Sequence, residues 1–161
     1  MERSVASSLV ALLAAVGAAV GGLSPSAHSA APEATAAPPF VVIANPSVPD
    51  TALTPKELAV LFLKKRTKWS DGSVVVPLDL DSTAAARLAF SDRILDKSIP
   101  QIKAYWQQRA FSGRAVPPPE LDTENELLRR VESSPGAIGY VSGAAELAAF
   151  KIKIISIIPD P

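Results

Sequence analysis

The stretch Ser134-Pro135-Gly136-Ala137-Ile138-Gly139-Tyr140-Val141 decides the fold of this chain. It follows an amphipathic segment at 124–132, and its proline and glycine are typical helix stop signals. The apolar residues after them predict a buried strand, and Gly139 within it indicates the close approach of another backbone or a ligand. A helix, a tight turn and a buried strand in succession are typical of an α/β sheet, whose strand ends hold ligands.

Apolar runs and capping signals place the other elements around this unit. The run at 40–44 is apolar throughout and predicts a parallel strand covered on both faces. Further strands are predicted at 74–78 and 151–158, and helices at 84–95 and 144–150. Capping-box patterns begin three more helices, at Thr54, Ser98 and Thr123. This alternation predicts an α/β domain with a mostly parallel sheet and helices on both faces.

Residues 1–31 are predicted to be a signal peptide rather than part of the domain. A short positive start at Arg3, an alanine-rich apolar run and small residues before Ala31 follow one another. A membrane anchor is the alternative, because the apolar run approaches spanning length. Residues 32–39 form an Ala/Pro-rich linker, and 40–161 suffice for one domain. The mature protein is expected in the periplasm or outside the cell, with no stable insertion in a membrane after signal cleavage.

Composition excludes several kinds of chemistry. The chain has no cysteine, and its one histidine, His28, lies in the targeting segment. A Ser-His-Asp hydrolase and a histidine-ligated zinc site are therefore disfavoured, and we predict a non-enzyme without a cofactor. Carboxylate or metal chemistry is not formally excluded. Lys+Arg and Asp+Glu balance at 16 each, so no large basic excess recruits nucleic acid.

Three segments resemble bacterial phosphate-type periplasmic solute-binding proteins, the substrate-binding proteins of ABC transporters. The first segment is Leu58–Phe62 with Lys64-Lys65 and Trp69-Ser70-Asp71-Gly72. The second is Tyr105-Trp106 with Phe111-Ser112-Gly113-Arg114 and Pro117-Pro118. The third is Val131-x-x-x-Pro135-Gly136-Ala137-Ile138-Gly139-Tyr140-Val141, and the three follow one another in the family's order. The resemblance runs from about residue 40 to 155. It implies one lobe of a two-lobed type II periplasmic-binding-protein fold, the second lobe of full-length relatives. The implied ligand is phosphate, and the implied partner is an ABC permease or another envelope protein.

The strongest candidate site is Ser82-Thr83, at a helix start directly after a strand. A helix N-terminus offers unpaired N–H groups and partial positive charge to an oxyanion, and hydroxyls add donors. Arg87 lies one turn further on and could reach the same anion. In the alternative interpretation, Ser82 or Asp81 only caps the helix.

At this place the sequence departs from the family. Phosphate-binding members carry a run like R.sGSGT, whereas this chain has Leu78-Asp79-Leu80-Asp81-Ser82-Thr83. The arginine and both glycines are missing. Asp79 and Asp81 would repel a phosphate dianion unless they pair with Arg87 or a metal. One carboxylate can still accept a hydrogen bond from a protonated phosphate.

Asn45, Ser47 and Tyr140 are further candidate ligand-binding residues. Asn45 and Ser47 follow the first strand, where they either line the ligand edge or form a turn. Tyr140 either presents its hydroxyl to a ligand or seals the core edge.

Other conspicuous residues have plainer interpretations. Trp69 and Trp106 are expected to pack in the core, and Phe111 to anchor its loop. Two aspartates are too few ligands to indicate a metal site. The basic run at 64–68 either contacts an anionic surface or is a solvated face.

The sequence therefore predicts a secreted solute-binding-like protein that holds a small oxyanion such as phosphate weakly. One lobe cannot enclose a small ligand as two closing lobes do. The alternative is a periplasmic interaction or signalling module that keeps the fold and has lost the ligand, as the altered loop at 79–83 suggests.

Overall fold

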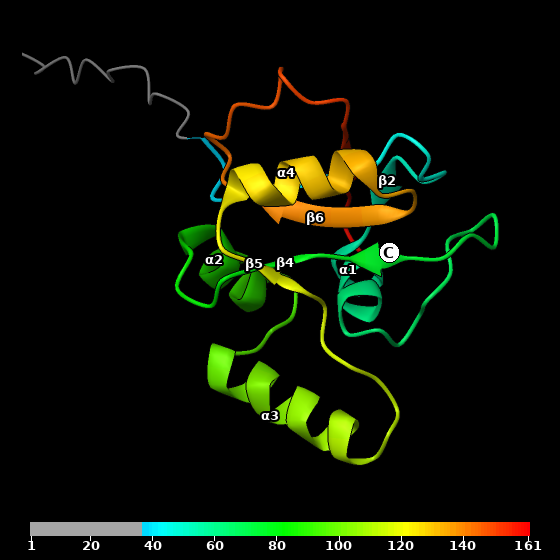
Figure 1. The fold of residues 1–161 in the computed structure, drawn as a ribbon, viewed down its shortest axis with the longest axis vertical. Coiled ribbons are helices and arrows are strands. Elements are labelled where there is room, and N and C mark those ends of the chain that lie inside the picture. Colours follow the sequence, from blue (N-terminus) through cyan, green and yellow to red (C-terminus); the bar gives the residue numbers. More distant parts are fainter. Residues whose placement is uncertain (1–36) are drawn as a thin grey trace, which may run out of the picture. The chain divides into compact units, whose positions relative to one another are not determined.

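The structure, a computed structural model, describes residues 37–161 (Figure 1). The predicted signal peptide and most of the predicted linker lie outside the described residues. In chain order the elements are β1 (Val41–Ala44), β2 (Ala52–Leu53), α1 (Pro55–Phe62), β3 (Val76–Pro77), β4 (Asp79–Leu80), α2 (Ala85–Arg93), α3 (Ile99–Phe111), β5 (Glu120–Leu121), α4 (Glu124–Ser133), β6 (Ala137–Val141) and β7 (Lys153–Ile157). No helix in this part of the chain is long and apolar enough to cross a membrane.

Within 37–161, five strands form one sheet in the order β2-β7-β1-β6-β3, and β4 pairs with β5 beside it. The pairs β2–β7, β3–β6 and β4–β5 are parallel. Strand β1 instead runs antiparallel to both of its neighbours, β6 and β7. The α/β prediction is confirmed, but the sheet is mixed at its centre. An apolar run indicates that a strand is covered on both faces, but it does not indicate the direction of the strand. The antiparallel strand β1 is covered on both faces as well.

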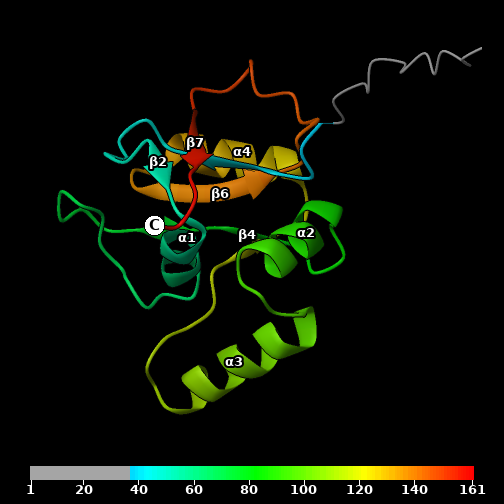
Figure 2. The ribbon, with the colours of Figure 1, turned by 180° about the vertical axis from the view of Figure 1, so that it is seen from behind.

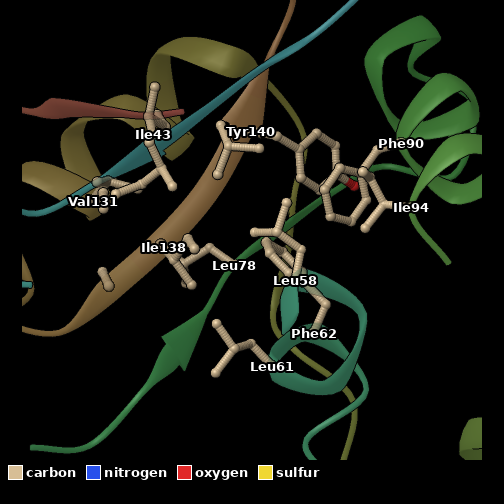
Figure 3. Close-up of a cluster of buried hydrophobic side chains, with 14 of the residues drawn as sticks. Ile43, Leu58, Leu61, Phe62, Leu78, Phe90, Ile94, Val131, Ile138 and Tyr140 are labelled. Atoms are coloured by element: carbon tan, nitrogen blue, oxygen red, sulfur yellow. The ribbon is translucent and has the colours of Figure 1, made fainter. Parts of the chain in front are cut away.

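The two faces of β6 explain its sequence. Ile138 and Tyr140 point to the side of α1 and α2, where they meet Leu58, Phe62 and Phe90 (Figure 3). The Tyr140 and Phe90 rings stack with centroids 4.0 Å apart. Successive residues of a strand face opposite sides of the sheet, so Gly139 faces α4. A Cβ at Gly139 would lie 2.7 Å from Leu127 Cδ2. The predicted close approach at Gly139 is therefore made by a side chain rather than by a backbone.

Helices cover both faces of the sheet, as predicted: α4 lies on one side, and α1 and α2 on the other (Figures 1 and 2). The capping boxes at Thr54 and Ser98 are complete, whereas at Thr123 only the threonine half forms. Helix α3 stands away from the sheet in both views. It buries only Ile102 and Trp106.

One predicted element is wrong, and another is shorter than predicted. Residues 144–150 form turns rather than a helix. The backbone bonds here are Ala145 N–H to Ser142 O and Phe150 N–H to Leu147 O, which close two separate turns and do not continue as a helix. The strand predicted at 74–78 is confirmed but shorter, as β3 at Val76–Pro77. Leu78 still donates to Ile138 O of β6 at 2.8 Å, and the chain then pairs with β5. Asp79 therefore lies in β4 and not in a loop.

Candidate functional site

Arg87, Asp79 and Tyr140 form a buried polar cluster. Arg87 is 2% exposed and Asp79 4% exposed. The Arg87 guanidinium pairs with the Asp79 carboxylate, and its Nη1 also donates to Tyr140 Oη at 3.2 Å. The Tyr140 hydroxyl donates to Asp79 Oδ1, which also accepts from the Leu80 N–H at 3.1 Å. Arg87 therefore neutralises Asp79, one of the two ways sequence analysis left open for that carboxylate.

The short β4–β5 pair creates this cluster. Pairing of Asp79 with Glu120 holds the Asp79 backbone against β5. Arg87 projects from the first turn of α2 and also lies 4.0 Å from Glu120 Oε1. Burying two charges is tolerable only where they pair and their remaining groups are hydrogen-bonded. Arg87 Nε nevertheless has no hydrogen-bond partner among the described residues.

Burial raises the pKa of Tyr140 to about 12, although the Arg87 charge opposes the shift. The hydroxyl therefore stays protonated in the folded state at pH values where it ionises in the unfolded chain, near pH 10. Its contribution is complete below pH ~10 and is lost as the pH rises through ~12, a loss of about 2–3 kcal/mol in unfolding free energy. Urea melts across this window should show a shallower decline for Tyr140→Phe than for the wild type. Equal declines in the two proteins would refute the assignment.

Helix α2 starts later than the sequence predicts. Its N-cap is Ala84, and no side chain caps it. The alternative in which Ser82 or Asp81 caps the helix is therefore wrong. Asp81 Oδ1 instead accepts from the N–H and the hydroxyl of Thr83, forming a turn before the helix. The first-turn N–H groups of α2 are left without a side-chain acceptor.

Ser82 and Arg87 line the same pocket, of about 420 Å³. Helix α3 supplies six of the ten lining residues, so the pocket lies between α3 and the start of α2. Ile102 and Trp106 form an apolar wall. Lys103 adds a cation and Glu120 an anion. Sequence reasoning missed Lys103 and Glu120, because neither carries a local motif and only the placement of α3 and β5 brings them to Arg87.

The other candidate residues do not join this pocket. Asn45 donates to Val131 O and Glu132 O, both at 2.8 Å, and ties the end of β1 to α4. Ser47 Oγ accepts from the Gly136 N–H at 3.0 Å and lines a separate pocket. Thr83 is exposed and is not among the lining residues, and Tyr140 is buried in the core. Trp69 and Trp106 are both buried, as predicted.

Two observations bear on chemistry. Within residues 37–161, no group of three or more His, Cys, Asp or Glu side chains is placed to hold a metal ion. Asp81 is held ionised, because hydrogen bonds from Thr83 lower the pKa of its carboxyl. The arrangement around the pocket is suited to binding through N–H, hydroxyl and cationic groups.

Comparison of folds finds similar solved structures. PstS from Borrelia burgdorferi superposes with a TM-score of 0.58 at 17% identity, covering 76% of this chain and 48% of its own. A phosphate ABC transporter substrate-binding protein from Clostridium perfringens, solved with bound phosphate, gives 0.57 at 16% identity, with 73% and 44% covered. An ABC-type phosphate transport receptor from Vibrio cholerae gives 0.55 at 15%, with 73% and 45% covered.

The likeness is one of fold. No protein-family model matches the sequence, and no curated protein is detectably similar to it. The chain spans about half the length of the solved structures it matches. The resemblance predicted from three sequence motifs is confirmed at this level: the chain has the fold of part of a phosphate-type substrate-binding protein.

Proposed function

We propose that this protein is a non-enzymatic solute-binding module that receives a small oxyanion such as phosphate at the start of α2. One observation carries the proposal: the uncapped N-terminus of α2 adjoins a pocket lined by both Ser82 and Arg87. Free N–H groups and the helix dipole favour an anion there. The solved structures with the same fold include one that holds phosphate.

The same geometry limits the affinity. Asp79 already pairs with Arg87, and Glu120 lies 4.0 Å from the same guanidinium. The positive charge available to a ligand is therefore small. Solvent-exposed ion pairs contribute only about 0–1 kcal/mol each to the binding free energy. We expect phosphate binding no tighter than roughly millimolar, near −4 kcal/mol.

Titration with phosphate at constant ionic strength, followed by calorimetry and NMR, tests the site. Asp81→Asn should tighten binding severalfold, because it removes a negative charge beside the helix start and keeps the acceptor for Thr83. Ser82→Ala should weaken binding severalfold through the loss of a donor.

Asp71→Asn is the matched control for Asp81→Asn. Asp71 Oδ1 accepts from the N–H and hydroxyl of Ser73 in the same kind of turn, away from α2. Its substitution should leave phosphate binding unchanged. Micromolar binding by the wild type would show that Asp79 and Glu120 weaken phosphate binding less than we expect. Binding that is equal in all variants would remove the site.

We further propose export to the periplasm or the cell exterior, with an ABC permease as the partner. The support is the sequence of residues 1–31 and the fold shared with transport-type binding proteins. Mass spectrometry of the protein recovered from the periplasm should show an N-terminus near residue 32. An intact Met1 in that fraction would contradict a cleaved signal.

An interaction or signalling module is the second candidate, and the buried Asp79–Arg87 pair favours it. A guanidinium that already pairs with a buried carboxylate is poorly placed to bind a ligand. Asp79 also lies in the segment where the phosphate-binding proteins that this sequence resembles carry a glycine-rich run. An absence of any oxyanion response in the titrations above, with the fold intact, would put this candidate first.

A further inference from the structure

Two sequence stretches without acidic residues meet at one end of the domain. No Asp or Glu occurs between Glu57 and Asp71, or between Asp96 and Glu120. The Tyr105 hydroxyl of α3 donates to Leu63 O at 2.8 Å, and Lys64 Nζ approaches Pro117 O at 3.4 Å. These bonds join the segment after α1 to α3 and to the loop that follows it.

The cations of these two stretches, apart from Lys97 before the start of α3, make up what we call the basic pole. It consists of Lys64, Lys65, Arg66, Lys68, Lys103, Arg109 and Arg114. Among residues 37–161, only Arg66 of this set has a carboxylate within 4.0 Å, namely Glu57 at 3.9 Å. Because the full chain has no net charge, this concentration is a segregation of charge and not a reflection of composition.

Apolar side chains protrude from the same surface. Phe111, at the end of α3, is 93% exposed, and Val116 in the following loop is 67% exposed. The expectation that Phe111 anchors its loop is therefore wrong. An aromatic ring that protrudes among Lys and Arg is typical of segments that lie in a lipid headgroup layer.

We propose that the basic pole docks on an anionic lipid bilayer, with Phe111 inserted among the headgroups. A stable protein partner would need roughly 800 Å² of complementary surface around a buried apolar centre. The pole offers two protruding apolar side chains, from a helix end and a loop, surrounded by cations. A fluid anionic surface requires no such shape match. Of the cations in the basic pole, Lys103 also lines the oxyanion pocket, and the proposal does not depend on an anion bound there.

Vesicle sedimentation tests the proposal, with phosphatidylcholine alone or in an equal mixture with phosphatidylglycerol. Binding should require the anionic lipid and should fall with added salt, since exposed charges are screened. Each cation near such a surface contributes about fivefold to partition. The triple variant Lys65→Gln/Lys68→Gln/Arg114→Gln should therefore bind on the order of a hundredfold more weakly. Lys103 is left unchanged because it lines the pocket.

Matched controls lie away from the basic pole. Arg129 and Arg130 on α4, with Lys151, are exposed cations, so their triple change to Gln removes the same charge and should leave binding nearly unaltered. Helix α4 lies across the sheet from α3 (Figures 1 and 2). Phe111→Ala should weaken binding about tenfold. Ile154→Ala, at a 57% exposed position on β7, should not.

All variants carry the same N-terminus, fixed by mass spectrometry, so any contribution of residues 1–36 is common to them. Circular dichroism confirms folding. Equal binding to neutral and anionic vesicles, or equal losses in the control triple variant, would overturn the proposal. Charge-dependent binding that Phe111→Ala leaves unchanged and that soluble heparin abolishes would also overturn it, in favour of an acidic macromolecule as the occupant.

Discussion

Arg87→Leu is expected to cost about 3–5 kcal/mol in unfolding free energy, because it leaves the Asp79 carboxylate buried without a counter-charge. Asp79→Leu should cost less, since Glu120 lies 4.0 Å from the guanidinium that remains. In the double variant both charges are gone, and most of the loss should be recovered. Adding Tyr140→Phe removes the hydroxyl that would otherwise lose both partners. Urea denaturation of the complete cycle measures the coupling between the two charges.

A surface pair provides the control for this cycle. Lys56 and Asp160 lie 3.8 Å apart, with the Lys56 side chain 79% exposed. Lys56→Leu should change stability by less than about 1 kcal/mol. Additive losses in the Arg87 and Asp79 variants would show that the buried pair is not coupled. The cycle also shows why a loss of phosphate binding in an Arg87 variant would prove little, because the fold itself depends on that side chain.

Gly136→Ala is the second change with a large expected effect, at least about 3 kcal/mol. Gly136 has φ +75°, a conformation that costs an L-residue roughly 1–2 kcal/mol. In addition, a Cβ there would lie 2.2 Å from the carbonyl oxygen of Val74. That oxygen is backbone and cannot swing aside. The Gly136 carbonyl accepts from Trp69 Nε1 and from the Val76 N–H, so a shift would disturb the start of β3.

Gly72→Ala separates the two causes. Gly72 has φ +86° but no atom within 4 Å of an added Cβ. It should therefore show the conformational cost alone, roughly 1–2 kcal/mol. The difference between the two urea midpoints measures the clash with Val74. Equal losses would mean that the turn at Gly136 relaxes without moving β3.

Local sequence signals were sufficient for the elements whose cause is local. The capping residues at Thr54 and Ser98 begin helices in the structure, and the stop signal Pro135-Gly136 separates α4 from β6. These features depend on backbone groups within a few residues of each other, so sequence alone determined them.

The candidate site was predictable only in part. Ser82 and Arg87 line one pocket, and binding of an anion by both stays a prediction. Asn45 Oδ1 accepts from the Ser47 N–H at 3.0 Å, which is the turn of the alternative interpretation. The two side chains also fasten β1 to α4 and to the turn before β6, which the sequence did not predict. The roles of Asp79 and Tyr140 depend on their contacts with Arg87. In the sequence these residues lie 8 and 53 positions from Arg87, so only the fold brings the three together.

By itself, the sequence determined the α/β class, the buried β6 segment and the starts of α1, α3 and α4. Tertiary structure alone decided the direction of β1, the burial of Arg87 between Asp79 and Tyr140, and the meeting of two basic stretches beside an exposed Phe111. The physical reason is range. Capping and periodicity act within one or two turns of chain, whereas strand direction and charge pairing are set by which distant segments share one core.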